Sequence, residues 1–354
     1  MQDFFAHHKI KPQKIAVAVS GGADSLALAL MAKEELPVFG FEIVALTVNH
    51  HLRPSATAEA AYVADVMKAH GIEHHILEWT APKPQTGIEE AARIARYALL
   101  TEWCKQNGVK VLLTAHHRND QAETFLMRLQ RGSGLEGLCC MREVFENGDI
   151  IIARPLLHAA PETMRQYLQK RRIKWVDDES NVDTKFLRNR IRAFLPQLKN
   201  ATEISPQTLA QTADRLQSAE DYIETQVAQI LSEKVQTIAP EVFCFKHTDF
   251  LQWHREIKFR IIAALCRRRY IPRAEHILNA VAALSHLPFA GLTLGGREIF
   301  GAYGYIWLVP EIGAKRKASR KAWEDFVLQN PQYKGRKIPH KTRVAILAQA
   351  EKKI

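Results

Sequence analysis

The sequence is poor in the features that mark several protein classes. Its 354 residues include five cysteines and no Cys-x-x-Cys pair, which argues against a disulfide framework, a zinc ribbon and a cysteine-ligated cluster. No apolar run approaches the roughly 18 residues of a membrane span, and the first residues lack the basic-then-apolar layout of a signal peptide. We therefore predict a cytoplasmic protein that keeps its thiols reduced and has no membrane partner.

Positive charge exceeds negative charge and is unevenly distributed. The 49 lysines and arginines against 38 acidic residues give a net charge of +11. Residues 311–354 carry 12 basic and 4 acidic residues, and residues 165–199 carry 10 basic and 4 acidic residues. A solvated surface is one interpretation of such stretches. Two separate basic stretches favour contact with a long polyanion. RNA is favoured over duplex DNA, because no helix-turn-helix or zinc-finger pattern is present.

The first 155 residues alternate between short apolar runs and helical patterns. The run at residues 15–19 has no polar alternation, which predicts a strand that is buried on both faces. Further strands are predicted at residues 41–48, 73–79, 110–114 and 150–153. The helical patterns between them are residues 26–36, 55–70, 87–107 and 119–130. This alternation predicts an α/β fold with a doubly wound parallel sheet.

The pattern becomes mainly helical after about residue 155. Helices are predicted at residues 161–172, 186–198, 205–233, 253–269 and 273–286, with short strands at 241–246, 291–294 and 303–309. The length allows two or three domains. We predict an α/β domain at 1–200, a smaller mainly helical α+β domain at 201–310, and a basic C-terminal segment at 311–354. The C-terminal segment is interpreted as an incomplete small domain.

A glycine-containing turn follows the first predicted strand and opens a helix. It consists of Ser20, Gly21, Gly22, Ala23, Asp24 and Ser25. Two glycines allow a tight turn whose N–H groups point inward, and the helix N-terminus adds partial positive charge, so the turn suits a phosphate. A carboxylate among phosphates is explained by a bridging cation, and we interpret Asp24 as a Mg²⁺ ligand. The alternative is a glycine turn with an ordinary helix cap.

The first strand and this turn resemble the phosphate-binding loop (PP-loop) of the N-type ATP pyrophosphatases. Further segments resemble one family within that group, the tRNA(Ile)-lysidine synthetases. They are residues 48–53, 89–97, 115–124, 131–134, 154–156, 177–181 and 188–192. The resemblance extends over about residues 14–198. It implies an N-type ATP pyrophosphatase-like fold, with ATP and Mg²⁺ as cofactors of an adenylating reaction.

Two acidic residues and one arginine are candidates for catalysis. Asp120 and Glu123 are three residues apart at a helix start, so both carboxylates lie on one helix face. One of them can hold the metal and the other the ammonium of a lysine substrate, although acids at a helix start also serve as caps. Arg96 is a candidate for stabilising charge on the α-phosphate, with Arg93 as its rival. A surface salt bridge of Arg96 to residue 89 or 90 is the alternative.

The resemblance completes the set of predicted site residues. It assigns catalysis to Asp24, Arg96 and Asp120, metal binding to Asp24 and Asp120, and lysine binding to Glu123. It assigns ATP binding to all six residues of 20–25 together with His51 and Ala115. It assigns tRNA binding to Arg188, Arg190 and Arg192. The alternative for these three arginines is a solvated basic face. The histidine pairs at 50–51 and 116–117 are expected to line the nucleotide pocket or contact RNA. Zinc is disfavoured, because adjacent side chains point in different directions.

The resemblance also implies a reaction and its partners. ATP adenylates the wobble cytidine of an isoleucine tRNA with a CAU anticodon, and L-lysine then displaces AMP. Alternatives are another PP-loop tRNA-modifying enzyme such as a thiolase, a ligase acting on a small molecule, and a non-catalytic RNA-binding protein. The two basic stretches argue against a small-molecule ligase, and the intact 20–25 turn argues against a non-catalytic protein. A homodimer is left open.

Overall fold

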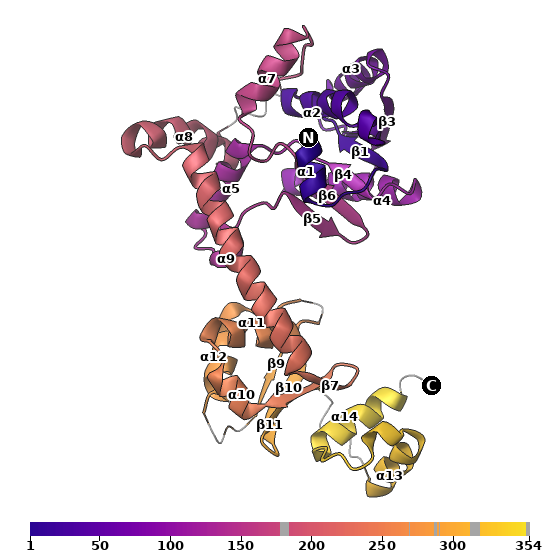
Figure 1. Cartoon of the computed structure of the whole chain (residues 1–354), viewed down its shortest axis with the longest axis vertical. Coiled ribbons are helices and arrows are strands. Elements are labelled where there is room, and N and C mark those ends of the chain that lie inside the picture. Colours follow the sequence, from indigo (N-terminus) through magenta and orange to yellow (C-terminus); the bar gives the residue numbers. More distant parts are fainter. Residues whose placement is uncertain (178–183, 269, 287–288, 290, 312–318, 352–354) are drawn as a thin grey trace. The chain divides into compact units, whose positions relative to one another are not determined.

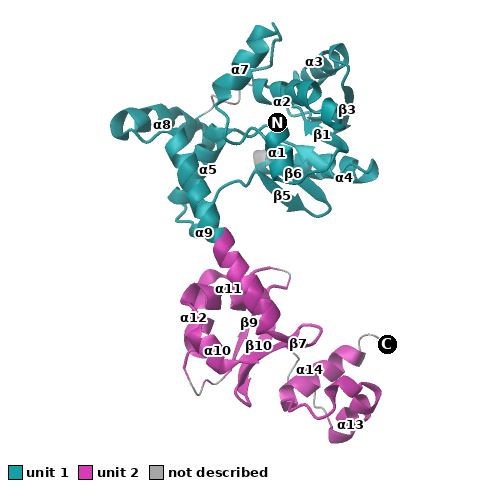
Figure 2. Ribbon diagram, in the orientation of Figure 1, with its two compact units in different colours: residues 1–220 teal, residues 221–354 magenta. Residues whose placement is uncertain are grey.

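The computed structural model describes residues 1–177, 184–268, 270–286, 289, 291–311 and 319–351. The chain forms two compact units, residues 1–220 and 221–354, which Figure 2 shows in different colours. The three-part division at residues 200 and 310 stays a prediction. None of the helices in the described ranges is long and apolar enough to cross a lipid bilayer.

The first unit is built around a six-stranded sheet (Figure 1). Its strand order is β3-β2-β1-β4-β6-β5. Its strands are β1 (Lys14–Ala18), β2 (Glu42–Asn49), β3 (Glu73–Glu78), β4 (Val111–Leu113), β5 (Val144–Asn147) and β6 (Ile150–Ala153). β1 pairs in parallel with β2 and β4, whereas β5 at one edge pairs antiparallel with β6. The predicted parallel sheet is therefore confirmed, with an additional antiparallel edge strand.

Helices cover both faces of this sheet. The helices and helical turn of the first unit are α1 (Gln2–His7), α2 (Ala23–Glu35), η1 (Pro37–Phe39), α3 (Ala56–Ala69), α4 (Ile88–Gln106), α5 (Arg118–Gln130), α6 (Leu135–Leu138), α7 (Pro161–Lys170), α8 (Leu187–Thr202) and the first part of α9 (Pro206–Glu233). Ile15 and Val17 of β1 belong to a core with α2, α3 and α7, whereas Ala16 packs on the opposite face with Leu100 of α4. Burial on both faces explains why these strands lack polar alternation.

The strand order defines where the site lies. From β1 the chain proceeds to β2 on one side, while β4 lies on the other side. In open α/β sheets, ligands bind beyond the carboxyl ends of the strands where the winding direction changes. The loops after β1 and β4 meet at this position, and they carry the 20–25 turn and residues 114–117.

The second unit contains a five-stranded antiparallel sheet with the order β7-β8-β11-β10-β9. Its strands are β7 (Gln236–Ala239), β8 (Val242–Lys246), β9 (Leu292–Leu294), β10 (Arg297–Ala302) and β11 (Tyr305–Pro310). Its helices are α10 (His247–Gln252), α11 (Arg255–Cys266), α12 (Ala274–Leu284), α13 (Arg320–Gln329), η3 (Pro331–Tyr333) and α14 (His340–Glu351). The unit therefore has the predicted α+β character. Strands β7 and β10 were not predicted, because β7 is only four residues long and β10 mixes apolar positions with Arg, Glu and Gly.

The basic C-terminal segment contributes to the core of the second unit. Trp323, Tyr333 and Ile338 pack against Trp307 of β11 and Val242 of β8 in one apolar cluster. The Tyr333 hydroxyl donates a hydrogen bond to the carbonyl of Ile238, at 3.1 Å. The described part of this segment is thus folded onto the sheet through its apolar side chains.

Candidate active site

The 20–25 turn is a tight loop between β1 and the N-terminus of α2. Gly21 has a φ of +87°, and an added Cβ would lie 3.3 Å from a methyl of Val63, so the position requires glycine. The Ser25 hydroxyl accepts a hydrogen bond from the Ser20 N–H at 3.0 Å and donates one to the Gly22 carbonyl at 3.1 Å. Ser25 is buried and braces the loop from inside. The loop leaves the helix N-terminus facing a cavity, as expected for a phosphate site.

A cavity of about 710 Å³ adjoins this loop. Its lining includes Ser20, Gly22, Asp24 and Ser25 of the loop, and Ala115 after β4. Of the described residues, five arginines and three acids line it, namely Arg53, Arg93, Arg96, Arg188, Arg192, Asp24, Glu59 and Asp120. The excess of positive charge favours a polyanionic ligand.

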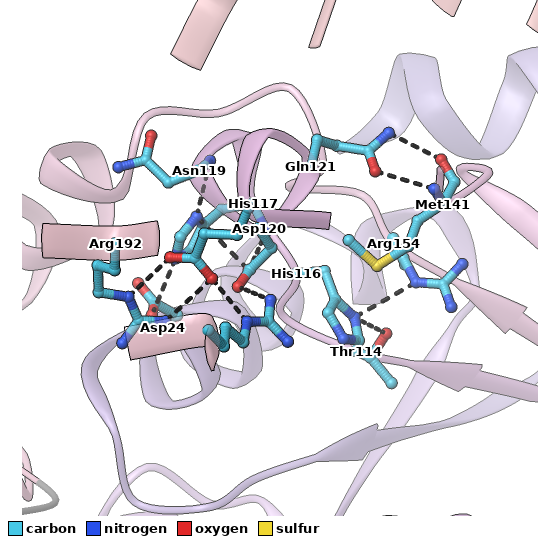
Figure 3. A network of polar contacts seen from close by, with 12 residues as sticks. Asp24, Thr114, His116, His117, Asn119, Asp120, Gln121, Met141, Arg154 and Arg192 are labelled. Atoms are coloured by element: carbon cyan, nitrogen blue, oxygen red, sulfur yellow. Dashed lines mark hydrogen bonds and ion pairs between the residues drawn. The ribbon is translucent and has the colours of Figure 1, made fainter. Parts of the chain in front are cut away.

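His117 lies between the two acids that were predicted to bind metal (Figure 3). Its Nε2 is 3.6 Å from an oxygen of Asp24, and its Nδ1 is 3.5 Å from an oxygen of Asp120. Its Nδ1 also accepts the N–H of Asn119, so that His117 caps helix α5. Burial opposes protonation of His117, but the hydrogen bond to Asp24 and the charges of Asp120 and Asp24 together raise its pKa.

Asp120 is held on two sides. One oxygen accepts the backbone N–H of His117 at 2.9 Å, and the other accepts an N–H of Arg188 at 2.6 Å. Burial opposes its ionisation, but the charges of His117 and Arg188 lower the pKa of Asp120. Asp120 therefore faces the cavity as a carboxylate that already has partners.

Glu123 is completely buried and is paired with two arginines of α8. Its oxygens accept the Nε–H of Arg188 at 2.6 Å and the Nε–H of Arg192 at 2.7 Å. Arg188 thus bridges Asp120 and Glu123, and joins α5 to α8. The lysine contact predicted for Glu123 stays a prediction, and in this arrangement an incoming ammonium would have to displace an arginine.

Arg96 lines the cavity without an acidic partner among the residues whose side chains are described. Burial, followed by the charges of Arg93 and Arg188, lowers its pKa. Its guanidinium carbon lies 5.6 Å from the ring centre of Tyr97, and that of Arg93 lies 5.3 Å from the same ring. The structure therefore brings both candidate arginines to the cavity, and the choice between them stays open. Of the two alternative partners of Arg96, Glu90 forms no ion pair with it, and the side chain of residue 89 lies outside the described part.

Five predicted site residues are absent from the cavity lining, namely Gly21, Ala23, His51, Glu123 and Arg190. His51 is exposed after β2 and contacts the carboxylate of Glu78 through Nε2. Arg190 is exposed and donates to the backbone carbonyls of Thr184 and Lys185, at 3.0 and 2.9 Å. The ATP role of His51 and the tRNA roles of all three arginines stay predictions. Residues 178–181, which belong to one of the motifs, lie outside the described residues.

The structure adds three residues to the site that were not assigned individual roles from the sequence. His117 bridges Asp24 and Asp120, and Arg154 after β6 contacts His116 beside the cavity. The available signal was topological: Arg154 immediately follows a predicted buried strand, at the ligand-binding ends of the parallel sheet.

Comparison with known proteins identifies the family. Residues 1–198 match the PP-loop domain family, which is more than half of the chain. The chain is 34% identical over 346 residues to the tRNA(Ile)-lysidine synthase of Bradyrhizobium diazoefficiens, and the match covers 90% of this chain and 95% of that protein. The chain belongs to the tRNA(Ile)-lysidine synthase family. The tRNA(Ile)-lysidine synthase of Wolbachia pipientis is 38% identical over 75% of this chain, which spans 63% of the Wolbachia protein.

A solved structure shares the fold of this family member. The U34-tRNA thiolase NcsA from Methanococcus maripaludis, with its [4Fe-4S] cluster, aligns with a TM-score of 0.52. The alignment covers 61% of this chain and 75% of the thiolase at 16% sequence identity. At that identity, the similarity shows the fold alone, and it agrees with the N-type ATP pyrophosphatase architecture that the sequence predicts.

Proposed function

We propose that this protein is a tRNA(Ile)-lysidine synthase. The C2 oxygen of the wobble cytidine in a CAU-anticodon isoleucine tRNA attacks the α-phosphate of ATP, and pyrophosphate leaves. The ε-amine of L-lysine then attacks C2 and AMP leaves, which yields lysidine. The modified tRNA reads AUA in place of AUG and accepts isoleucine. The single observation that carries this proposal is the similarity to a named relative along 95% of that relative's length.

The cavity supplies the groups that adenylation needs. The 20–25 loop and the N-terminus of α2 present N–H groups to the phosphates, while Arg96 and Arg93 lie in the same cavity. The guanidinium of Arg96, which has no acidic partner among the side chains that the structure describes, is available to neutralise charge that develops on the α-phosphate. Because the reacting groups are brought together in one partly enclosed space, much of the rate enhancement comes from positioning.

Asp24 fits a Mg²⁺ ion better than Asp120 does. The Asp24 side chain is 36% exposed and contacts His117 at 3.6 Å, whereas both oxygens of Asp120 already accept hydrogen bonds. Mg²⁺ is usually held by one or two carboxylates together with substrate phosphates and water. Among the described residues no set of three or more His, Cys, Asp or Glu is arranged as metal ligands, which agrees with a site completed by substrate. The ion, when bound, would offset phosphate charge.

The lysine ammonium requires an acidic partner near the adenylated base. Asp120 lines the cavity, and Glu123 lies behind it under Arg188 and Arg192. We place Asp120 beside the triphosphate and its Mg²⁺, and the lysine ammonium at Glu123, which requires that Arg188 moves aside. In a trapping assay with lysine omitted, Asp120→Asn should fail to adenylate tRNA. Glu123→Gln should adenylate it but need far more lysine to complete the product; unchanged lysine dependence would exclude this role of Glu123.

The tRNA must reach the cavity with its wobble base turned out of the anticodon loop. Arg190 and exposed basic residues of the second unit such as Lys334, Arg336 and Lys337 are suited to phosphate contacts, because they are accessible to solvent. Methionine tRNA shares the CAU anticodon, so discrimination has to use contacts away from the anticodon. We propose that the regions 165–199 and 311–354 make them.

A thiolase is less well supported. All five cysteines fall in the described residues and are absent from the cavity lining. Burial raises the pKa of Cys104 and of Cys140 to about 12, so neither is a ready nucleophile. The site therefore offers an adenylating centre without a sulfur donor.

The decisive experiment is mass analysis of nucleosides from isoleucine tRNA after incubation with the protein, ATP and isotopically labelled lysine. We expect a labelled lysidine nucleoside together with tRNA-dependent release of pyrophosphate. Methionine tRNA with the same anticodon is the matched control and should remain unlabelled. Release of pyrophosphate without label incorporation would contradict the proposal.

A further inference from the structure

Three side chains at the carboxyl ends of β4 and β6 form a polar chain next to the cavity (Figure 3). The Nε–H of Arg154 donates to Nδ1 of His116 at 3.3 Å, and the Thr114 hydroxyl lies 3.0 Å from the same nitrogen. His116 and Thr114 line the cavity, and Arg154 lies behind them; Thr114 is 6% exposed and Arg154 is 4% exposed.

The guanidinium of Arg154 has a fixed position. Its Nη1–H donates to the carbonyl of Arg142 at 2.7 Å, and its guanidinium carbon lies 4.6 Å from the ring centre of Phe145 in β5. The antiparallel hairpin of β5 and β6 therefore holds the arginine that contacts His116. No step of the proposed reaction uses this arginine directly.

An arginine side chain has only donors and keeps its proton in proteins. The imidazole nitrogen that faces its N–H must therefore present a lone pair, and the Thr114 hydroxyl is free to donate to that nitrogen as well. The ring proton of neutral His116 then resides on Nε2. Within the described chain Nε2 has no hydrogen-bond partner.

We propose that Arg154 is a positioning residue that fixes His116 as the Nε2–H tautomer, so that the neutral ring donates a hydrogen bond into the cavity. The acceptor of this hydrogen bond is an anionic phosphate oxygen. The identity of the acceptor rests on the proposed ATP site. The tautomer itself follows from the contacts of Arg154 and is independent of the substrate.

The electrostatic surroundings agree with a neutral ring. Burial, helped by the charges of Arg154, Arg96 and Arg188 and opposed by that of Asp120, lowers the pKa of His116 to about 3. A neutral imidazole donates a hydrogen bond through its ring N–H. Unlike an imidazolium, it does not readily transfer that proton to a phosphate oxygen. It thus adds a directed donor to a cavity whose cations are arginine side chains.

The first test is the tautomer of His116 in the full-length protein labelled with ¹⁵N-histidine. Resonances of His116 are assigned by their loss in His116→Gln, among the 15 histidines of the chain. At pH 7 the wild-type ring should be protonated at Nε2 and unprotonated at Nδ1. Arg154→Met should shift the tautomer ratio toward Nδ1–H about tenfold, the equivalent of one hydrogen bond from a charged donor. The control Arg171→Met removes an exposed arginine that pairs with Glu34 and should leave the ratio unchanged.

The second test uses tRNA-dependent pyrophosphate release. His116→Leu removes the donor and should reduce kcat about a hundredfold, whereas His116→Gln retains an N–H near the Nε2 position and should recover a large part of the loss.

The proposal is overturned if the wild-type His116 ring carries its proton at Nδ1 or is protonated on both nitrogens. It is also overturned if Arg154→Met leaves the tautomer ratio unchanged. Equal loss in the leucine and glutamine variants overturns the donor role. Failure to form lysidine would overturn the proposed function and leave the tautomer result standing.

Discussion

Replacing Glu123 by glutamine removes the charge that two arginines share. The carboxylate is completely buried, and its oxygens lie 2.6 and 2.7 Å from the donors of Arg188 and Arg192. Breaking a fully buried ion pair costs about 3–5 kcal/mol, because the remaining charge has no partner. The side chains of the two arginines are 35% and 41% exposed, so water compensates part of that loss. We expect a net destabilisation of about 2 kcal/mol.

Thermal unfolding of the full-length protein measures this effect. A destabilisation of that size should lower the Tm of the first unit by roughly 4–8 °C. Glu34→Gln is the matched control, because both oxygens of Glu34 pair with Arg171 on the surface, at 2.8 and 3.0 Å. That variant should leave the Tm almost unchanged. If Glu123→Gln and Glu34→Gln unfold at the same temperature, the buried pair does not hold α5 against α8.

Three further variants test other parts of the molecule. Asp24→Asn should abolish tRNA-dependent pyrophosphate release while circular dichroism stays unchanged, and Asp65→Asn on α3 is the control; near-normal turnover with saturating Mg²⁺ would exclude the metal role. Gly21→Ala should weaken ATP binding and destabilise the fold by about 1–2 kcal/mol, because it combines positive φ with crowding. Gly71→Ala also has a positive φ but open space around it, so equal stability loss in both would exclude crowding. Replacing the three exposed basic residues within 334–337 by alanine should reduce the slope of the salt dependence of tRNA binding by about 0.7–0.9 for each phosphate that they neutralise. An unchanged slope would mean that these charges contribute to solubility and do not contact tRNA phosphates. Substitution is preferable to deletion here, because deletion would remove apolar residues from the core.

The sheet of the first unit was predictable because burial on both faces leaves a simple signal. Apolar runs such as residues 15–19 contain no polar position, and the sheet is parallel as expected. Strand β5 was not predicted because its sequence, Val-Phe-Glu-Asn, is short and partly polar. An edge strand is covered on fewer sides, so it does not need the apolar run that marks a fully buried strand. The antiparallel sheet of the second unit was incompletely predicted for the same reason.

The residues of the site were predictable one by one, but their pairing was not. Asp120 and Glu123 were expected on one helix face, and both accept hydrogen bonds from Arg188. Their arginine partners lie more than 60 residues further along the chain, and long-range charge pairing has no periodic signature in sequence. A local signal existed in the four-residue spacing of Arg188 and Arg192, which places both on one face of a helix and Arg190 on another.

The bridging of two acids by one arginine constrains how this family can change over time. Loss of Arg188 would leave Asp120 and Glu123 both short of a partner in a single step, and a lysine there would supply a point charge in place of a fork of donors. Loss of either acid would leave the guanidinium of Arg188 facing a neutral side chain in place of one carboxylate. An ancestor could therefore reach a different arrangement only through a poorly stable intermediate. We expect natural relatives to retain all three residues together or to have replaced them jointly.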